Sequence, residues 1–401
     1  MITVEEAWKI IEACKREYGA EMVPVEKALG RVLAEDLQAD RDFPPYNRVA
    51  MDGIALSFSS FENGNRIFKI KAVQGAGEKA IDITDSGECI EVMTGAVSPA
   101  STDTVVRYED LEIKDGQARI LAEHVKKGQN IHTKGKDKKQ GEVLVPAGQM
   151  VSSSVISLAA SVGKAELMVK KLPRMVIVSS GDELVEIHEN PLPYQIRSSN
   201  DYAIRAVLQP YGASPDMLHI PDDPELSVQK ISECIEKYDV ILLSGGVSMG
   251  KYDYIPQALE KLSVSKLFHK VLQKPGKPFW FGRHGNGALI FAFPGNPVSV
   301  FMCVHRYLLP WLNACLGIAQ PPMMAELQKD FSFPSSIQFF MLVKLELNEQ
   351  GKLIAWPLEG NGSGDFVQVA GAHAFMELPL KENIFHKGQL LRVWPFVEVM
   401  R

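Results

Sequence analysis

Residues 240–246 read Val-Ile-Leu-Leu-Ser-Gly-Gly, a short apolar run that stops at a pair of glycines. Two other runs, Met175–Ser179 and Leu289–Phe293, also stop at loops that contain glycine. Amphipathic helical patterns alternate with these runs between residues 172 and 318. Alternation of this kind is typical of βαβ units, and it predicts a parallel sheet with helices on both faces.

The helical patterns have the 3.6-residue spacing of apolar positions that marks one buried face of a helix. Residues 2–19 open with a further helical pattern, and Thr3 is a suitable N-cap for that helix. Helices are expected at Asn200–Gln209, Pro224–Lys237, Tyr254–Leu262 and Val298–Leu316, and also at Ser153–Ser161.

Two regions have a different residue pattern, with short β-type runs. Residues 46–140 contain short β-type runs separated by Gly, Pro and Asp, which favours a small all-β or barrel-like insertion. Residues 320–401 return to short strands, which predicts a small C-terminal β-domain. The chain of 401 residues is long enough for two to four domains.

Composition excludes several classes of protein. The 46% hydrophobic and 23% charged residues are typical of a soluble globular protein. A net charge of -6 argues against general binding of nucleic acid. We see no signal peptide and no apolar run of the ~18 residues that a membrane span needs. The five cysteines form no CxxC pair, which disfavours a cysteine zinc site and is typical of free thiols in a reducing cytoplasm.

The loops after the three apolar strands are rich in glycine and serine. Ligands of open α/β sheets bind at the carboxyl ends of the strands, where glycine admits a close ligand and helix N–H groups attract phosphate or another oxyanion. Each loop alone could be an ordinary tight turn, but three loops at one sheet edge favour a binding site. Neither a Walker loop nor a dinucleotide-binding motif is present. The candidate phosphate-binding residues in these "glycine loops" are Ser180, Gly181, Ser244, Gly245, Gly246, Ser248, Pro294, Gly295, Asn296 and Pro297.

Lysines gather around a Pro-Gly turn. Lys274 and Lys277 flank Pro275-Gly276, and Lys270 lies four residues before them. We name Lys274–Lys277 the lysine turn. Ammonium groups on a rigid turn can act as point charges for phosphate or a tetrahedral oxyanion, although a single lysine is usually a solvated surface group. A second basic segment around Asp137 is either a charged surface loop or part of the same anion site.

Carboxylates recur at turns, as Asp52, Glu183, Asp222 and Asp253. Oxygen ligands suit Mg²⁺, which typically binds one or two carboxylates together with substrate phosphates. Taken singly, each is more often a turn or N-cap residue. There is no HExxH and no Gly-x-Ser-x-Gly motif, so nothing supports a metalloprotease or a hydrolase with a serine nucleophile elbow. The residues alone therefore predict an oxyanion-binding edge assisted by Mg²⁺, and they do not name the substrate.

These motifs, in this order, resemble the molybdopterin molybdenumtransferase family, which includes MoeA and the E domain of gephyrin. The ordered set spans most of the chain. The matching stretches are Pro44-Pro45-x-x-Arg48-x-Ala50-Met51-Asp52-Gly53, Met93-Thr94-Gly95-Ala96, Gly181-Asp182-Glu183-Leu184, Ser244-Gly245-Gly246-Val247-Ser248-x-Gly250-x-x-Asp253, Lys274-Pro275-Gly276-Lys277-Pro278 and Pro294-Gly295-Asn296-Pro297-Val298-Ser299.

The resemblance implies a multidomain α/β plus β fold and an elongated homodimer whose active site lies in a cleft between subunits. It also implies the reaction, which is Mg²⁺-dependent insertion of molybdate into adenylylated molybdopterin with release of AMP. The adenylyltransferase of molybdopterin is a possible partner. The expected domains are a three-layer α/β domain with a parallel-type sheet (1–20 and 169–318), a linking α/β domain (21–45 and 141–168), a β insertion domain (46–140) and a C-terminal β-barrel-like domain (319–401).

Site residues carried over by motif fall into three groups. The resemblance implies catalytic roles for Asp52, Thr94, Asp137, Glu183, Lys270 and Lys274. It implies a molybdate pocket formed by Lys274, Lys277, Pro278, Ser299 and Ser363, and a Mg²⁺ site formed by Asp222 and Asp253.

The chain departs from the family pattern in the C-terminal domain. The usual Gly-Arg-x-x-Phe-x-Arg-type stretch reads Ser335–Met341 here and contains no arginine. Two alternatives to the molybdenumtransferase are therefore kept open. One is the adenylyltransferase of the preceding step, because that family shares the α/β domain and its Ser-Gly-Gly loop. The other is a pterin-binding scaffold without catalysis.

Overall fold

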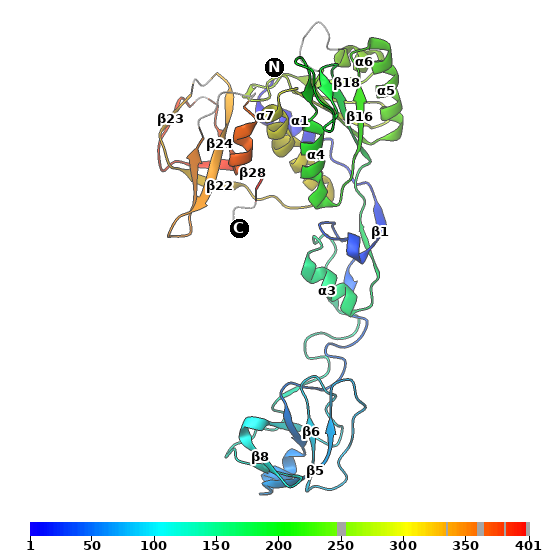
Figure 1. Ribbon diagram of the computed structural model, residues 1–401, viewed down its shortest axis with the longest axis vertical. Coiled ribbons are helices and arrows are strands. Elements are labelled where there is room, and N and C mark those ends of the chain that lie inside the picture. Colours follow the sequence, from blue (N-terminus) through cyan, green and yellow to red (C-terminus); the bar gives the residue numbers. More distant parts are fainter. Residues whose placement is uncertain (247–253, 334–335, 359–364, 381, 398–401) are drawn as a thin grey trace. The chain divides into compact units, whose positions relative to one another are not determined.

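The computed structural model describes residues 1–246, 254–333, 336–358, 365–380 and 382–397. The chain divides into two compact units, which we describe separately (Figure 1). The finer division into four domains stays a prediction. Unit 1 comprises Met1–Ala34, Gly148–Ile156 and Glu166–Arg401, and unit 2 comprises Glu35–Ala147 and Ser157–Ala165.

A six-stranded sheet forms the centre of the α/β part of unit 1. Its first four strands are parallel, and the last two run antiparallel to their neighbours, so the sheet is mixed where a parallel one was expected. Edge strands β16 and β18 were not predicted, because edge strands are partly exposed and lack an unbroken apolar run. The order across the sheet is β16 (Asp216–Ile220), β13 (Met175–Ser180), β17 (Val240–Ser244), β21 (Leu289–Phe293), β20 (Trp280–Arg283) and β18 (Ser265–His269).

Helices cover both faces of this sheet, which confirms the predicted three-layer architecture (Figure 1). On β17, Ile241 and Leu243 point into one apolar core and Val240 and Leu242 into the other. Burial on both faces explains why the central strands are unbroken apolar runs. One face carries α5 (Pro224–Lys237) and α6 (Ile255–Lys261), and the other carries α1 (Val4–Glu12), α4 (Asn200–Leu208), α7 (Pro297–Cys303) and α8 (Leu309–Leu316).

Helices α4 and α6 lie within one residue of their predicted bounds, whereas two other helices differ more. The first ends at Glu12, although its start is as expected, with Thr3 and Glu6 forming a capping box. The helix predicted at Val298–Leu316 is divided by a π-helical turn, Val304–Leu308. Pro310, two residues after this turn, has no backbone N–H to bond to the preceding turn, which accounts for the change of helical register.

The C-terminal part of unit 1 is a closed barrel of five strands, as predicted. The barrel is closed because β24 pairs with both β25 and β26. A separate apolar core fills its interior. A two-residue strand from the α/β part, β19 (Gln273–Lys274), pairs in parallel with the start of β24. The ring consists of β24 (Gln338–Leu347), β25 (Leu353–Pro357), β22 (Met323–Leu327), β28 (Leu390–Pro395) and β26 (Ala374–Leu378), and the same region contains β23 (Phe331–Ser332), α9 (Val367–Gly371) and β27 (Ile384–Phe385).

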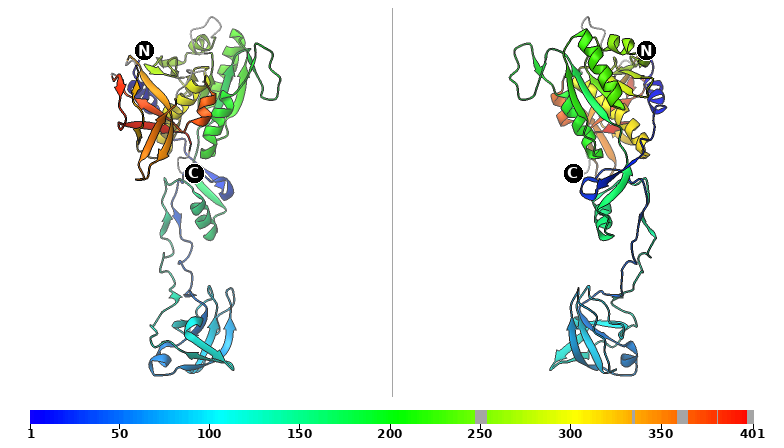
Figure 2. Two further views of the ribbon diagram at one scale, coloured as in Figure 1. Left: turned by 60° about the vertical axis from the view of Figure 1, so that its left-hand side comes forward. Right: turned by 90° about the vertical axis from the view of Figure 1, so that its right-hand side faces the viewer.

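Unit 2 contains a second six-stranded sheet, which Figure 2 shows from two sides. Apolar clusters lie on both faces of this curled sheet. Its order is β7 (Thr104–Arg107), β4 (Gly53–Leu56), β6 (Glu88–Val92), β5 (Ile67–Gln74), β9 (Gln117–Ile120) and β8 (Leu111–Lys114), with α2 (Phe58–Glu62) after β4.

Short paired strands complete both units. In unit 1, β1 (Ala20–Pro24) pairs with β12 (Glu166–Lys170), and β14 (Leu184–Val185) pairs with β15 (Ile196–Arg197). In unit 2, β2 (Leu37–Gln38) pairs with β11 (Val143–Val145), and β3 (Arg48–Val49) pairs with β10 (Ile131–His132). Helix α3 (Ser153–Ser161) has the predicted bounds. In the ranges that the structure describes, no helix combines the length and apolar character needed to cross a membrane.

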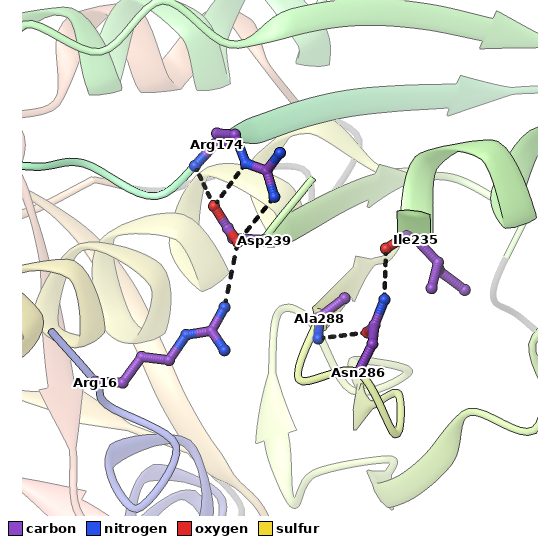
Figure 3. A network of polar contacts seen from close by, with 6 residues as sticks. All are labelled: Arg16, Arg174, Ile235, Asp239, Asn286 and Ala288. Atoms are coloured by element: carbon purple, nitrogen blue, oxygen red, sulfur yellow. Dashed lines mark hydrogen bonds and ion pairs between the residues drawn. The ribbon is translucent and has the colours of Figure 1, made fainter. Parts of the chain in front are cut away.

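An ionic network joins the amino ends of β13 and β17 (Figure 3). The Asp239 carboxylate accepts hydrogen bonds from the Arg174 backbone N–H at 2.9 Å and from its guanidinium at 3.2 and 3.3 Å. Arg16 donates to the same carboxylate at 3.4 Å. Burial raises the pKa of Asp239, but the bonds and charges of Arg174 and Arg16 outweigh burial and lower it overall.

We expect Asp239→Asn to lower the free energy of unfolding of unit 1 by about 1–3 kcal/mol at neutral pH. A carboxyl with a lowered folded-state pKa stabilises the fold above its unfolded-state pKa of about 3.9, and that contribution is lost as the pH falls through the folded-state value. The difference from wild type should therefore shrink in acid. Urea denaturation followed by tryptophan fluorescence measures it, because all five tryptophans lie in unit 1. An equal difference at neutral pH and at about pH 3 would contradict the role of the charge.

Candidate active site

The glycine loops meet at the carboxyl edge of the unit 1 sheet. Asn200, at the start of α4, donates through Nδ2 to the Ser244 hydroxyl and to the Gly295 carbonyl, both at 2.9 Å. A Cβ on Gly295 would lie 3.8 Å from the Gly245 Cα. One amide side chain thus ties the loop after β17 to the loop after β21. Asn200 was absent from the candidate residues, although its place in the Ser198-Ser199-Asn200 stretch was a signal.

The paired glycines after β17 allow the loop to approach β13. Gly245 and Gly246 have φ of +90° and +66°, which favours glycine. A Cβ at Gly246 would lie 2.7 Å from Ile255 Cγ1 and 3.1 Å from the Ser180 hydroxyl. A side chain at Gly246 would therefore push the loop away from the end of β13.

Carboxylates lie at the ends of β13 and β16. The Ser180 hydroxyl donates to Asp222 Oδ1 at 3.4 Å, and the Asp222 backbone N–H donates to Asp182 Oδ1 at 3.0 Å. Glu183 folds back so that its carboxylate would meet a Cβ on Gly181. Asp182 was not among the candidate residues, and only the structure indicates its contact with Asp222.

These oxygen donors fit Mg²⁺ by their chemistry. Within the described residues no three His, Cys, Asp or Glu side chains gather as a closed metal site. Mg²⁺ does not need such a cage, because it commonly binds one or two carboxylates, water and substrate phosphates. Asp222 with its neighbour Ser180 could supply the protein ligands on this edge. Asp253, the other predicted ligand, lies outside the described residues.

The lysine turn lies on helix α7. Lys274 and Lys277 are exposed, whereas Gly276 is buried with φ of +87°. A Cβ on Gly276 would lie 2.8 Å from Cys303 Sγ and 2.9 Å from Met302 Cε, so only glycine fits there. The turn thus presents two ammonium groups from a backbone that is packed against the protein core.

Two more candidate residues lie next to this turn. Ser299 is 3% exposed and lies three and four residues before Met302 and Cys303, hence on the same face of α7 as the contact with Gly276. Lys270 has φ of +70°, and its backbone is fixed by a bond from its N–H to the Phe279 carbonyl at 3.0 Å. Pro278 follows the turn directly, and Asn296 and Pro297 begin α7.

In unit 2 the side chain of Asp52 has well-defined partners. Its Oδ1 accepts hydrogen bonds from the Thr94 backbone N–H at 2.6 Å and from the Thr94 hydroxyl at 2.7 Å. These two bonds lower the pKa of Asp52. The carboxylate is therefore ionised at neutral pH and held at one place on the surface of unit 2.

Asp137 contacts the β10–β3 pair through His132. His132 Nε2 is 2.9 Å from Asp137 Oδ1, and Arg48 approaches His132 Nδ1 at 3.5 Å. His132 and Arg48 face each other across the β10–β3 pair, and Val97 bridges to Arg48 from the other side. His132 was missed in the sequence, where its position five residues before Asp137 was the available signal.

The predicted site residues thus form one group in unit 1 and one in unit 2. The unit 1 group joins the glycine loops, and the lysine turn lies on the helix that follows the third of them. The unit 2 group consists of the Asp52–Thr94 pair and the Asp137–His132 pair. Ser248, Asp253 and Ser363 lie outside the described residues.

Comparison with known proteins places the whole chain in one family. Three family models match in order: the MoeA N-terminal region (domain I and II) at residues 2–163, the probable molybdopterin binding domain at 176–314, and the MoeA C-terminal region (domain IV) at 324–396. The solved structure of the molybdopterin biosynthesis moeA protein from Pyrococcus horikosii superposes with a TM-score of 0.80 at 27% identity. The match spans 99% of this chain and 100% of the Pyrococcus chain.

Two curated relatives match over nearly their full length. A molybdopterin molybdenumtransferase from Synechocystis sp. is 38% identical over 97% of this chain and 98% of its own length. Another from Staphylococcus epidermidis is 29% identical over 98% of this chain and 95% of its own length. The chain therefore belongs to the MoeA family of molybdopterin molybdenumtransferases, which confirms the resemblance drawn from its motifs.

Proposed function

We propose that this enzyme inserts molybdate into adenylylated molybdopterin and releases AMP in molybdenum cofactor biosynthesis. The observation that carries the proposal is the meeting of the glycine loops beside a lysine turn, in a chain 38% identical to a molybdenumtransferase. Both substrates are anionic, because molybdate is a dianion and the adenylylated pterin carries phosphates. A sheet edge with glycine-rich loops before helices and with ammonium groups nearby is suited to both.

The proposed division of labour follows from the position of each group. The backbone N–H groups of the glycine loops, together with Ser180 and Ser244, would bind the phosphates. Lys274 and Lys277 would bind the molybdate oxygens, with Ser299 and Pro278 lining the same pocket, and Lys270 would lie beside the phosphates. Much of the rate acceleration would come from holding the two reactants together in a preorganised electrostatic environment.

Mg²⁺ is part of the proposal as the resident metal. When bound, it would neutralise negative charge on the phosphoanhydride link that is broken when AMP is released. Asp222 and Asp253 would be its ligands, and Glu183 would lie close by. Asp52, fixed as an anion by Thr94, and Asp137, hydrogen-bonded to His132, would complete the set of acidic groups around the pterin nucleotide.

We further propose a homodimer in which the active site lies in a cleft between subunits. The two relatives and the family models cover each part of the chain, so residues of both units are expected to contribute. The enzyme would act in the cytoplasm, a compartment that suits its five free cysteines. It would receive its substrate from the molybdopterin adenylyltransferase.

One assay tests this function against both alternatives. Purified protein is incubated with adenylylated molybdopterin, Mg²⁺ and molybdate, and AMP and molybdenum-loaded cofactor are measured. Release of both in a molybdate-dependent manner is the expected result. Consumption of ATP to form the adenylate would instead identify an adenylyltransferase, and binding without turnover would identify a scaffold. Chelation of Mg²⁺ with EDTA should abolish AMP release, and undiminished release would exclude the metal from the proposal.

A further inference from the structure

The residue before the lysine turn has a fully buried amide side chain. Gln273 is 0% exposed, and its Nε2 donates to the Gly276 carbonyl at 3.0 Å and lies 3.6 Å from Cys303 Sγ. Gly276 is the residue between Lys274 and Lys277 on which the turn depends. The Gln273 side chain therefore forms a buried hydrogen bond within the lysine turn, on the side that faces the core. Both ammonium groups lie on the exposed side.

The other end of this amide is held by a buried tyrosine. The Tyr307 hydroxyl donates to Gln273 Oε1 at 2.5 Å. Tyr307 is 0% exposed, and its ring packs on Phe279 with centroids 5.0 Å apart. Burial raises the pKa of Tyr307, so its hydroxyl keeps its proton and stays a donor. A rigid aromatic residue in the helical core thus fixes the orientation of the amide.

Backbone bonds hold the strand before the turn and part of the turn itself, and the Gln273 amide adds a side-chain bond within it. Gln273 pairs with Gln338 in the β19–β24 ladder, and the Gln338 N–H donates to the Leu272 carbonyl at 2.9 Å. Beyond Lys274, the Gln273 amide and the packing of Gly276 on Cys303 hold the turn. Two backbone bonds also hold it, from the Val271 N–H to the Lys277 carbonyl at 2.9 Å and from the Phe279 N–H to the Gly276 carbonyl at 3.2 Å. The spacing of the two ammonium groups therefore depends on a side chain that never reaches the surface.

We infer that Gln273 and Tyr307 are positioning residues that set the geometry of the lysine turn and thereby the affinity of the enzyme for the oxyanion. This inference rests on the proposed molybdate site. A tetrahedral dianion gains from two cations only if both are held at matching distances, and a loose turn must be ordered again at each binding event. The alternative is a buried polar pair that contributes to stability alone.

Tyr307→Phe removes one buried hydroxyl and leaves the ring in place. The expected result is a KM for molybdate raised by about five- to tenfold, the effect of losing one buried hydrogen bond, while the KM for adenylylated molybdopterin stays within about twofold. Tyr211→Phe is the matched control, because Tyr211 is partly buried and bonds to Asn313 away from the turn. Equal changes in both variants, or a loss of stability without a change in the KM for molybdate, overturn the inference.

A double-mutant cycle gives a second readout that does not depend on one variant. Gln273→Met removes the amide but keeps an unbranched side chain of similar length. Because the two residues would act through one hydrogen bond, the double variant Gln273→Met/Tyr307→Phe should raise the KM for molybdate no more than Gln273→Met alone. Additive effects, or a KM equal to wild type in all three, overturn the inference.

The same experiments separate this inference from the proposed function. If the wild type releases no AMP with molybdate, the function fails, and the inference fails with it. If the wild type turns over and Lys274→Ala is impaired, but Tyr307→Phe and Gln273→Met bind molybdate as well as wild type, the function stands and the inference alone is overturned.

Discussion

Lys274→Ala is expected to lower kcat/KM for molybdate by about 100- to 1,000-fold, the range measured when one preorganised charge-stabilising group is removed from an active site. Lys274 is exposed on a turn whose glycine is packed against Cys303 and Met302, so the ammonium group is presented from a fixed backbone. Its side chain lies over the Phe333 ring, with Nζ 5.6 Å from the centroid, which restricts its direction further. Steady-state release of AMP at varied molybdate concentration measures the effect.

Two companion variants make this result specific. Lys266→Ala removes another exposed lysine of unit 1, on β18, and should retain wild-type turnover. Lys274→Arg keeps the charge but replaces a compact ammonium group with a planar fork, so it should recover only part of the activity. A rate for Lys274→Ala equal to that of Lys266→Ala would remove Lys274 from the proposed molybdate site.

Asp52→Ala is expected to lower turnover by at least about 100-fold while the fold stays intact. The carboxylate accepts two hydrogen bonds from Thr94, which keep it ionised and fixed, and no core packing depends on it. Because these bonds lower its pKa, the group keeps its charge to a lower pH than an ordinary aspartate. Activity that depends on this charge should therefore persist down to a pH below the usual carboxyl range.

Asp82→Ala is the matched control for Asp52→Ala. Asp82 lies in the same unit, accepts a hydrogen bond from the Ser101 backbone N–H at 2.9 Å, and also has a lowered pKa. It belongs to none of the motifs. Turnover should be normal in this variant, and comparable losses in both would mean that the effect of Asp52→Ala is structural.

Mixing the two inactive variants tests the proposed subunit cleft. If each active site combines Lys274 from one subunit with Asp52 from the other, a mixed dimer of Lys274→Ala and Asp52→Ala chains carries one intact site. Co-expressed and purified mixed dimers should then regain up to about half of the wild-type activity. Activity that stays at the level of the single variants would place both residues of a site on the same chain.

The sequence by itself determined the elements whose signal is local. The central strands β13, β17 and β21 were predicted because burial on both faces leaves an unbroken apolar run. Helices α3 and α5 have their predicted bounds, since Asp223 caps α5 through bonds to the next backbone N–H groups and Pro224 begins it. The glycine loops and the family were also readable, because turn chemistry and ordered motifs are written in consecutive residues.

Only the tertiary structure decided what depends on residues far apart in the chain. Asn200 bonds to Ser244 across 44 residues and to Gly295 across 95, and Gln273 meets Tyr307 across 34. The barrel closes through a pairing of β24 with β26 that no local pattern specifies. The sequence does not distinguish a buried glutamine from an exposed one. Only packing determines which polar groups are removed from water and therefore need a hydrogen-bond partner.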